Sequence, residues 1–157
     1  MTLFGLIMAL ILLMVFSPIF SYIHSRQSIT VGTENINTAL KSYSESAFNE
    51  LFDEAKNPEQ LNGIYYSLIG NKDFKDTLIE NVLSAANFTL VDENENKYKS
   101  DGNVFIYNPI IIFEKQSNVY AIKMLYDIEV PLKILGINVY NYKNTYIGNC
   151  SIRQNVK

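Results

Sequence analysis

The feature that most constrains this chain is its N-terminal segment, residues 1–23, which contains no charged side chain. As an α-helix this segment would reach about 35 Å, against about 30 Å for the hydrocarbon core of a bilayer. A cleaved secretory signal has a basic start and a shorter apolar core, and this segment has neither. We therefore expect residues 1–23 to be retained as a transmembrane or filament-core helix.

No Lys or Arg precedes the apolar segment. Such residues normally mark the cytoplasmic side of a membrane span. One explanation is that a short basic leader has been removed, which would make Met1 a processed terminus.

Pro18 lies inside the apolar segment. A proline removes one helical hydrogen bond, so it predicts a kink or a locally melted turn. In lipid such a break needs neighbouring groups to satisfy the freed backbone. A bundle of packed copies would supply them better than a lone anchor.

The helix is expected to continue over residues 24–57 as an amphipathic extension. Apolar side chains recur there at spacings of three and four, which is typical of a helix with one face on a core. We expect Gly32 to be a weak point between the two halves, and Asn57-Pro58 to end the helix. The apolar stripe consists of Ile36, Leu40, Tyr43, Ala47, Leu51 and Ala55, widened by Phe48 and Phe52.

Residues 58–157 are expected to form a globular head that begins with two short helices. The first covers residues 58–70, and Asp73 is predicted to cap the second. The polar run 92–103 is interpreted as a solvated hairpin loop, because its acidic spacing does not match a calcium-binding loop. The apolar faces consist of Leu61, Ile64, Tyr65, Leu68 and Ile69 in the first helix, and of Phe74, Leu78, Val82 and Ala85 or Ala86 in the second.

Strands are predicted for the rest of the head. Apolar and polar residues alternate over residues 119–131, which is typical of a sheet with one solvated face. In the preceding apolar run 104–113, Pro109 predicts a bulge or an edge position, and Glu114 to Asn118 is expected to connect the two strands. Further strands are expected after Pro131, with a bend at Gly136, and over residues 144–153.

The predicted fold class is therefore α+β. A long N-terminal helix, apolar and then amphipathic, packs on a small C-terminal antiparallel sheet of three or four strands. In the strand over residues 119–131, the apolar residues that alternate with polar ones are Tyr120, Ile122, Met124, Tyr126, Ile128 and Val130.

Composition argues against several functions. A net charge of −3 and only two arginines, Arg26 and Arg153, do not form the basic patch that nucleic-acid binding needs. One histidine, His24, and one cysteine, Cys150, leave almost no material for a nucleophile–base pair or a metal site. We expect no enzymatic activity and no cofactor, His24 as a polar residue at the membrane interface, and Cys150 as a half-buried strand residue, with an intermolecular disulfide as the alternative.

Two N-x-S/T triplets make Asn87 and Asn149 candidate glycosylation sites. Such triplets arise often by chance in a chain rich in asparagine. We favour a structural role for both asparagines.

The order of these segments resembles the type IV pilin architecture. The opening Met1-Thr2-Leu3 followed by an apolar run is similar to a mature pilin terminus, written F/M-T-L-I-E-L, and the stretch MLYDIEVPLKILGINVY is similar to the strand–VPL–strand ending of TadE-like pseudopilins. The resemblance implies a mechanical function. The chain would be held in the membrane first, and inner-membrane assembly machinery would then pack it with copies of itself or with other pilins into a cell-surface, extracytoplasmic filament.

One departure from this pattern concerns the fifth position. Pilins usually carry a glutamate there that pairs with the terminal amine of a neighbouring subunit, whereas this chain has Gly5, and its first acidic residue is Glu34. Three explanations stay open: a minor or tip subunit, a filament whose subunits are registered by packing alone, or a protein that is not a pilin. In the last case we expect a single-span accessory protein of a secretion, competence or conjugation apparatus with an extracytoplasmic interaction domain.

The residues expected to contact lipid or neighbouring helices all lie in the apolar segment. Gly5 and Ala9 have the small-xxx-small spacing that permits close helix approach, although this spacing also arises by chance. The full set is Met1, Leu3, Phe4, Gly5, Ile7, Ala9, Leu12, Phe16, Pro18 and Phe20.

Overall fold

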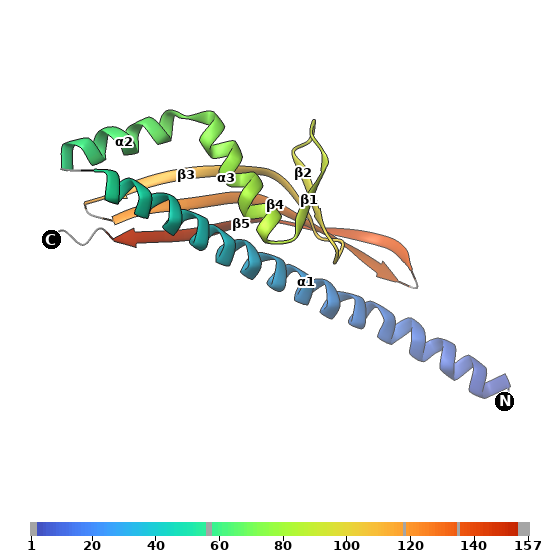
Figure 1. Ribbon diagram of the computed structural model, residues 1–157. Coiled ribbons are helices and arrows are strands. Elements are labelled where there is room, and N and C mark those ends of the chain that lie inside the picture. Colours follow the sequence, from blue (N-terminus) through green and yellow to red (C-terminus); the bar gives the residue numbers. More distant parts are fainter. Residues whose placement is uncertain (1–2, 56–57, 118, 135, 154–157) are drawn as a thin grey trace.

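The computed structural model describes residues 3–55, 58–117, 119–134 and 136–153. Three helices are followed by five strands, and one long helix runs diagonally across the sheet and far beyond it (Figure 1). The predicted α+β architecture is confirmed. The elements are α1 (Leu3–Glu54), α2 (Pro58–Gly70), α3 (Lys72–Ala85), β1 (Phe88–Asp92), β2 (Lys97–Ser100), β3 (Phe105–Gln116), β4 (Val119–Ile134) and β5 (Ile137–Arg153).

Helix α1 is one uninterrupted helix of 52 residues that includes Pro18. The melted turn predicted at Pro18 and the weak point predicted at Gly32 are therefore wrong (Figure 1). Proline removes only one backbone donor, and the turns on either side remain helical. Gly32 is buried beside the Phe88 ring, which a Cβ atom there would contact at 3.4 Å, so this glycine lies in a packed part of the helix.

Helices α2 and α3 match the predicted segments closely, but the capping residue differs. The side chain of Asn71 accepts a hydrogen bond of 3.1 Å from the Phe74 N–H, so Asn71 is the N-cap and Asp73 lies in the first turn. Asp73 is still favourable there because the N-terminus of a helix attracts negative charge. At the other end of α3, Ala86 is buried and Ala85 is exposed.

The sheet is antiparallel and has five strands in the order β1-β2-β3-β4-β5. The expectation of three or four strands missed the β1–β2 hairpin, because the polar run 92–103 was interpreted as a loop. Residues 97–100 of this run form β2, which pairs with both β1 and β3. This polar segment is part of the sheet because the buried side chain of Tyr98 anchors it on the core.

Pro109 coincides with the bulge that it predicted. The register between β3 and β4 shifts between Tyr107 and Ile110, and Asn108 has a φ of 48°. The connection after β3 is shorter than expected, because Glu114, Lys115 and Gln116 all pair with β4.

The predicted strand bend at Gly136 is wrong. Strand β4 continues through Pro131 to Ile134, and Gly136 lies between β4 and β5 with a φ of +82°. Glycine adopts this conformation without steric cost, which suits a tight turn. The bend was expected because nothing in the sequence shows that β4 and β5 form one long hairpin.

The core lies between the helices and one face of the sheet. The predicted alternation in β4 is confirmed, since Tyr120, Ile122, Met124, Tyr126, Ile128 and Val130 are all buried. From α1, Ile36, Leu40 and Phe48 pack into the same cluster. In the described part of the chain the opposite face of the sheet is open to solvent, with Ile110, Ile112 and Ile147 exposed.

Candidate membrane and assembly surface

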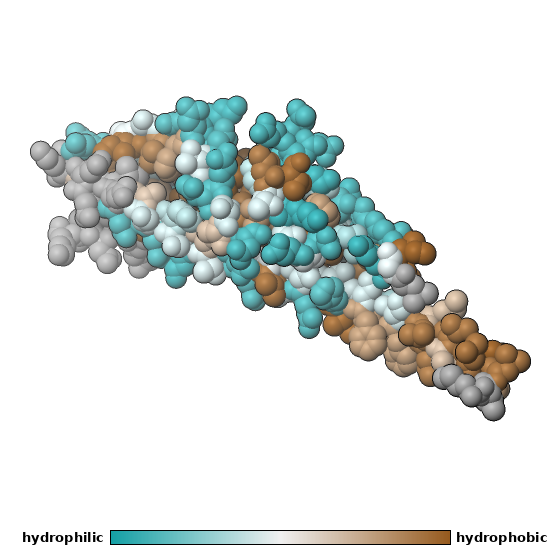
Figure 2. All heavy atoms as spheres, turned by 45° about the vertical axis from the view of Figure 1, so that its right-hand side comes forward, coloured by the Kyte–Doolittle hydropathy of each residue, from teal (hydrophilic) through white to brown (hydrophobic). Residues whose placement is uncertain are grey.

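Among the described residues, none covers the N-terminal part of α1. Its most apolar 18-residue window has a mean hydropathy of 2.7, and none of that window is buried. Figure 2 shows this part as a hydrophobic rod that projects from a largely hydrophilic head. Within the part of the chain that the structure describes, α1 is the one helix that is both long enough and apolar enough to cross a membrane.

Nine of the ten residues expected on this surface lie on the projecting rod, and Met1 lies outside the described residues. Gly5 and Pro18 are half-exposed, and Ala9 is exposed one helical turn from Gly5. The rings of Phe16 and Phe20 lie 6.4 Å apart between centroids. The large side chains in this set are Leu3, Phe4, Ile7, Leu12, Phe16 and Phe20, and each is about half or more exposed.

The environment of α1 changes within one or two turns. Ser25 and Ile29 are each 6 % exposed, and Ile36 is fully buried beneath the sheet. Ser21, at the transition, accepts a hydrogen bond of 3.0 Å from the Lys133 N–H of β4. The same helix is therefore an uncovered rod before Ser21 and a core element after Ser25.

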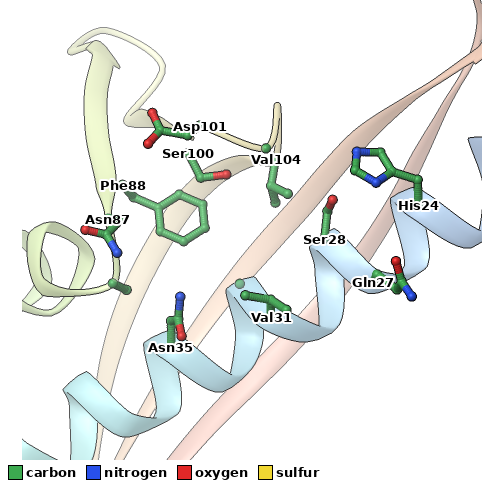
Figure 3. A pocket seen from close by; sticks show the side chains of 13 residues that line it. His24, Gln27, Ser28, Val31, Asn35, Asn87, Phe88, Ser100, Asp101 and Val104 are labelled. Atoms are coloured by element: carbon green, nitrogen blue, oxygen red, sulfur yellow. The ribbon is translucent and has the colours of Figure 1, made fainter.

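His24 is exposed immediately beyond the charge-free segment. It lies at one end of an open cavity of about 370 Å³ between α1 and the loops that flank β1 and β2 (Figure 3). Ser28 and Asn35 line the cavity from α1, and Phe88 and Asp101 line it from the opposite side. Among the described residues, no group of three or more His, Cys, Asp or Glu side chains could hold a metal ion.

The two candidate glycosylation sites occupy different settings. Asn87 follows α3 with a φ of 63°, and its N–H donates a hydrogen bond of 3.0 Å to the Ser84 carbonyl. Asparagine is one of the residues that tolerate this left-handed conformation at a helix end, which is a structural reason for its presence. Asn149 is exposed in β5 opposite Lys123.

Cys150 is more deeply buried than expected. It lies in β5 opposite Ile122 and is 6 % exposed. Burial raises the pKa of its thiol, and nearby Glu45 acts in the same direction. A buried, protonated thiol is poorly placed for an intermolecular disulfide.

The sequence did not reveal a polar cluster on the open face of the sheet. The Glu129 carboxylate is 2.8 Å from Lys143 Nζ and accepts a hydrogen bond of 2.7 Å from Asn141. The Lys97 and Lys143 ammonium groups lie 5.1 and 5.8 Å from the centre of the Tyr107 ring. Cross-strand register brings these residues together, and register cannot be read from residue spacing alone.

Comparisons with protein-family models, curated proteins and solved structures found no match to this chain. Its function is therefore inferred from its own geometry. The most distinctive element of that geometry is the uncovered apolar rod.

Proposed function

We propose that this protein is a structural subunit of a type IV pilus-like, Tad-type extracellular filament, assembled through its apolar N-terminal helix. One observation carries the proposal: α1 is a single helix whose apolar half is uncovered and whose other half is the central support of the head. This construction lets one element serve as membrane anchor and as filament core.

The same surface serves two successive environments in this proposal. Lipid covers the rod before assembly, and the rods of neighbouring copies replace lipid afterwards. Close packing between helices favours small residues, and Gly5 and Ala9 offer them on one face. The helix stays intact at Pro18, so it can pass from one environment to the other as a rigid rod.

The second candidate is a single-span accessory protein of a secretion, competence or conjugation apparatus that does not polymerise. Gly5 favours it, because no carboxylate is present at that position to pair with the terminal amine of another subunit. In this case the rod remains in lipid and the head binds a partner.

Electron microscopy of sheared surface material separates the two candidates. Producing cells are sheared, and the released material is labelled with an antibody against residues 34–157. Label along thin filaments is the expected result, and its density distinguishes a major from a minor subunit. Label confined to membrane fragments would reject the filament and leave the anchor.

Cysteine cross-linking gives an independent test. Phe16→Cys places a thiol on the exposed rod, while the native Cys150 is buried. Oxidation of sheared material should give covalent dimers of the Phe16→Cys variant if rods pack together. Tyr66→Cys, at a position in α2 that is 65 % exposed, controls for random collision between heads. Equal dimer yields for the two variants would argue against a packed core of rods.

A further inference from the structure

The hairpin formed by β4 and β5 extends beyond the rest of the sheet. Strand β3 pairs with β4 only as far as Glu129, so residues 130–134 of β4 pair with β5 alone. This two-stranded extension, residues 130–142 without the undescribed position 135, is called the arm below. Figure 1 shows that the arm lies along α1 and points toward its N-terminus.

A hydrogen bond fixes the height of the arm along α1. The Lys133 N–H donates to Ser21 Oγ at 3.0 Å, although the two residues are 112 positions apart. Ser21 belongs to the charge-free segment, whose helical length of about 35 Å slightly exceeds a hydrocarbon core of about 30 Å. When the rod spans a bilayer, Ser21 therefore lies close to the membrane interface, and the tip of the arm projects roughly 3–7 Å further along the rod.

The tip of the arm carries exposed apolar side chains beside the polar Asn138. Ile137, Val139 and Tyr140 are 70 %, 54 % and 61 % exposed. Natural hairpin ends usually carry polar turn residues, and charged side chains protect exposed strand edges. In Figure 2 the hydrophobic surface at the end of the sheet lies close to the hydrophobic surface of the rod. Lipid that covers the rod therefore lies within reach of the tip of the arm.

The arrangement of these side chains matches the interface of a bilayer. The register of the arm shifts between Leu132, which pairs with Tyr140, and Lys133, which pairs with Asn138, so Val139 is the extra residue of a bulge. Leu132 and Ile134 lie on one face of β4, and their partners Tyr140 and Ile137 therefore share that face. Val130 is buried in the core on the same face, so the apolar side of the tip continues the side of the sheet that α1 covers. Lipid that surrounds the rod therefore reaches the tip without a further partner. Tyrosine is enriched at the headgroup level of membranes, and the exposed Lys133 can extend its ammonium group toward phosphate.

We propose that the tip of the arm inserts into the boundary between headgroups and acyl chains while the rod spans the membrane. This inference rests on the membrane-anchored stage of the proposed function. The inserted tip is a second contact with the bilayer, and it fixes the height and rotation of the head before assembly.

Tryptophan fluorescence tests the proposal on the full chain, because the native sequence contains no tryptophan. Ile137→Trp is reconstituted in vesicles of phosphatidylcholine and phosphatidylglycerol, with and without lipids brominated near the headgroup end of their acyl chains. Ile147→Trp is the matched control, since Ile147 lies in the same strand, is 63 % exposed and is ten positions from Ile137. Phe16→Trp reports on the rod itself.

The expected result is blue-shifted emission of Ile137→Trp and quenching at least twofold stronger than for Ile147→Trp. If Phe16→Trp is quenched and Ile137→Trp behaves like Ile147→Trp, the arm proposal is rejected and membrane anchoring stands. Shielding of Ile137→Trp that increases with protein density without lipid quenching also rejects it, because a second copy would then cover the tip. Absence of quenching at Phe16→Trp would reject anchoring and the arm proposal together.

Discussion

Gly148 of β5 faces Asn37 of α1 so closely that a Cβ atom on Gly148 would lie 2.8 Å from Asn37 Oδ1. The same atom would lie 3.3 Å from Cδ2 of Leu40, a fully buried residue of the core. Gly148 itself pairs with Met124 in β4. A side chain at this position would thus have to displace the Asn37 amide and press on Leu40, where α1 is seated on the sheet.

Gly148→Val should destabilise the head. Its added carbons would displace the Asn37 side chain and press on the buried Leu40, and overpacking of this kind typically costs about 1–3 kcal/mol. Urea denaturation of the full chain in detergent micelles, followed by the near-ultraviolet circular dichroism of its tyrosines, measures the change. Gly63→Val is the control, because a Cβ atom at Gly63 meets nothing within 4 Å. Equal midpoints for the two variants would contradict the close contact.

Lys143→Ala should lower the urea midpoint more than Lys41→Ala. Lys143 neutralises Glu129, whose side chain is only 11 % exposed, so its removal leaves a largely buried carboxylate without its cation. Lys41 pairs with Glu45 at 3.9 Å on an open helix surface, where ion pairs contribute little. Similar midpoints for both variants would show that the polar cluster does not stabilise the sheet.

The Cys150 thiol should react with an aromatic disulfide reagent at least about tenfold more slowly in the folded chain than in urea. Burial shields the sulfur, and the raised pKa of the thiol lowers the fraction of reactive thiolate. Ile147→Cys in a Cys150→Ala background is the control, since position 147 is exposed in the same strand. Fast modification of native Cys150 would revive the alternative of an intermolecular disulfide.

Stability should fall at alkaline pH in part because of Tyr126. Burial raises the pKa of Tyr126 above its ordinary value near 10, and nearby Tyr146 adds to the effect. Below pH 10 both folded and unfolded chains keep the proton. Above pH 10 the unfolded chain loses it first, so this residue lowers the free energy of unfolding by about 1.4 kcal/mol per pH unit.

Tyr126→Phe should make that decline shallower. Urea midpoints at pH 9 and pH 11 measure the slope, and Tyr66→Phe, at an exposed position, should keep the slope of the parent. An unchanged slope in Tyr126→Phe would mean that other groups account for the alkaline loss of stability.

Local patterns predicted the helices and strand β4. The charge-free run and the apolar stripe after it gave the extent of α1, because helical periodicity is a property of neighbouring residues. The alternation in β4 identified its buried face correctly for the same reason. Capping was less predictable, since Asn71 and Asp73 are both good capping residues and only the position of the Phe74 N–H distinguishes them.

The errors concern features that depend on distant residues. Strand β2 was interpreted as loop because Tyr98 is its only buried residue, and its place on the core depends on pairing with β1 and β3. Gly32 was interpreted as a flexible point because the sequence does not show that Phe88 packs against it. For Tyr98 and for Gly32 alike, the structural role depends on contacts with residues that are distant in the sequence.

The sequence by itself determined that one helix would be apolar and then amphipathic, and that an antiparallel sheet would follow. These are consequences of hydrophobic periodicity and turn chemistry within short windows. Only the tertiary structure decided that the β4–β5 arm lies beside Ser21, and that Glu129 meets Lys143 on the open face of the sheet. Such neighbours depend on strand register and on the angle between helix and sheet, which are set by packing across the whole head.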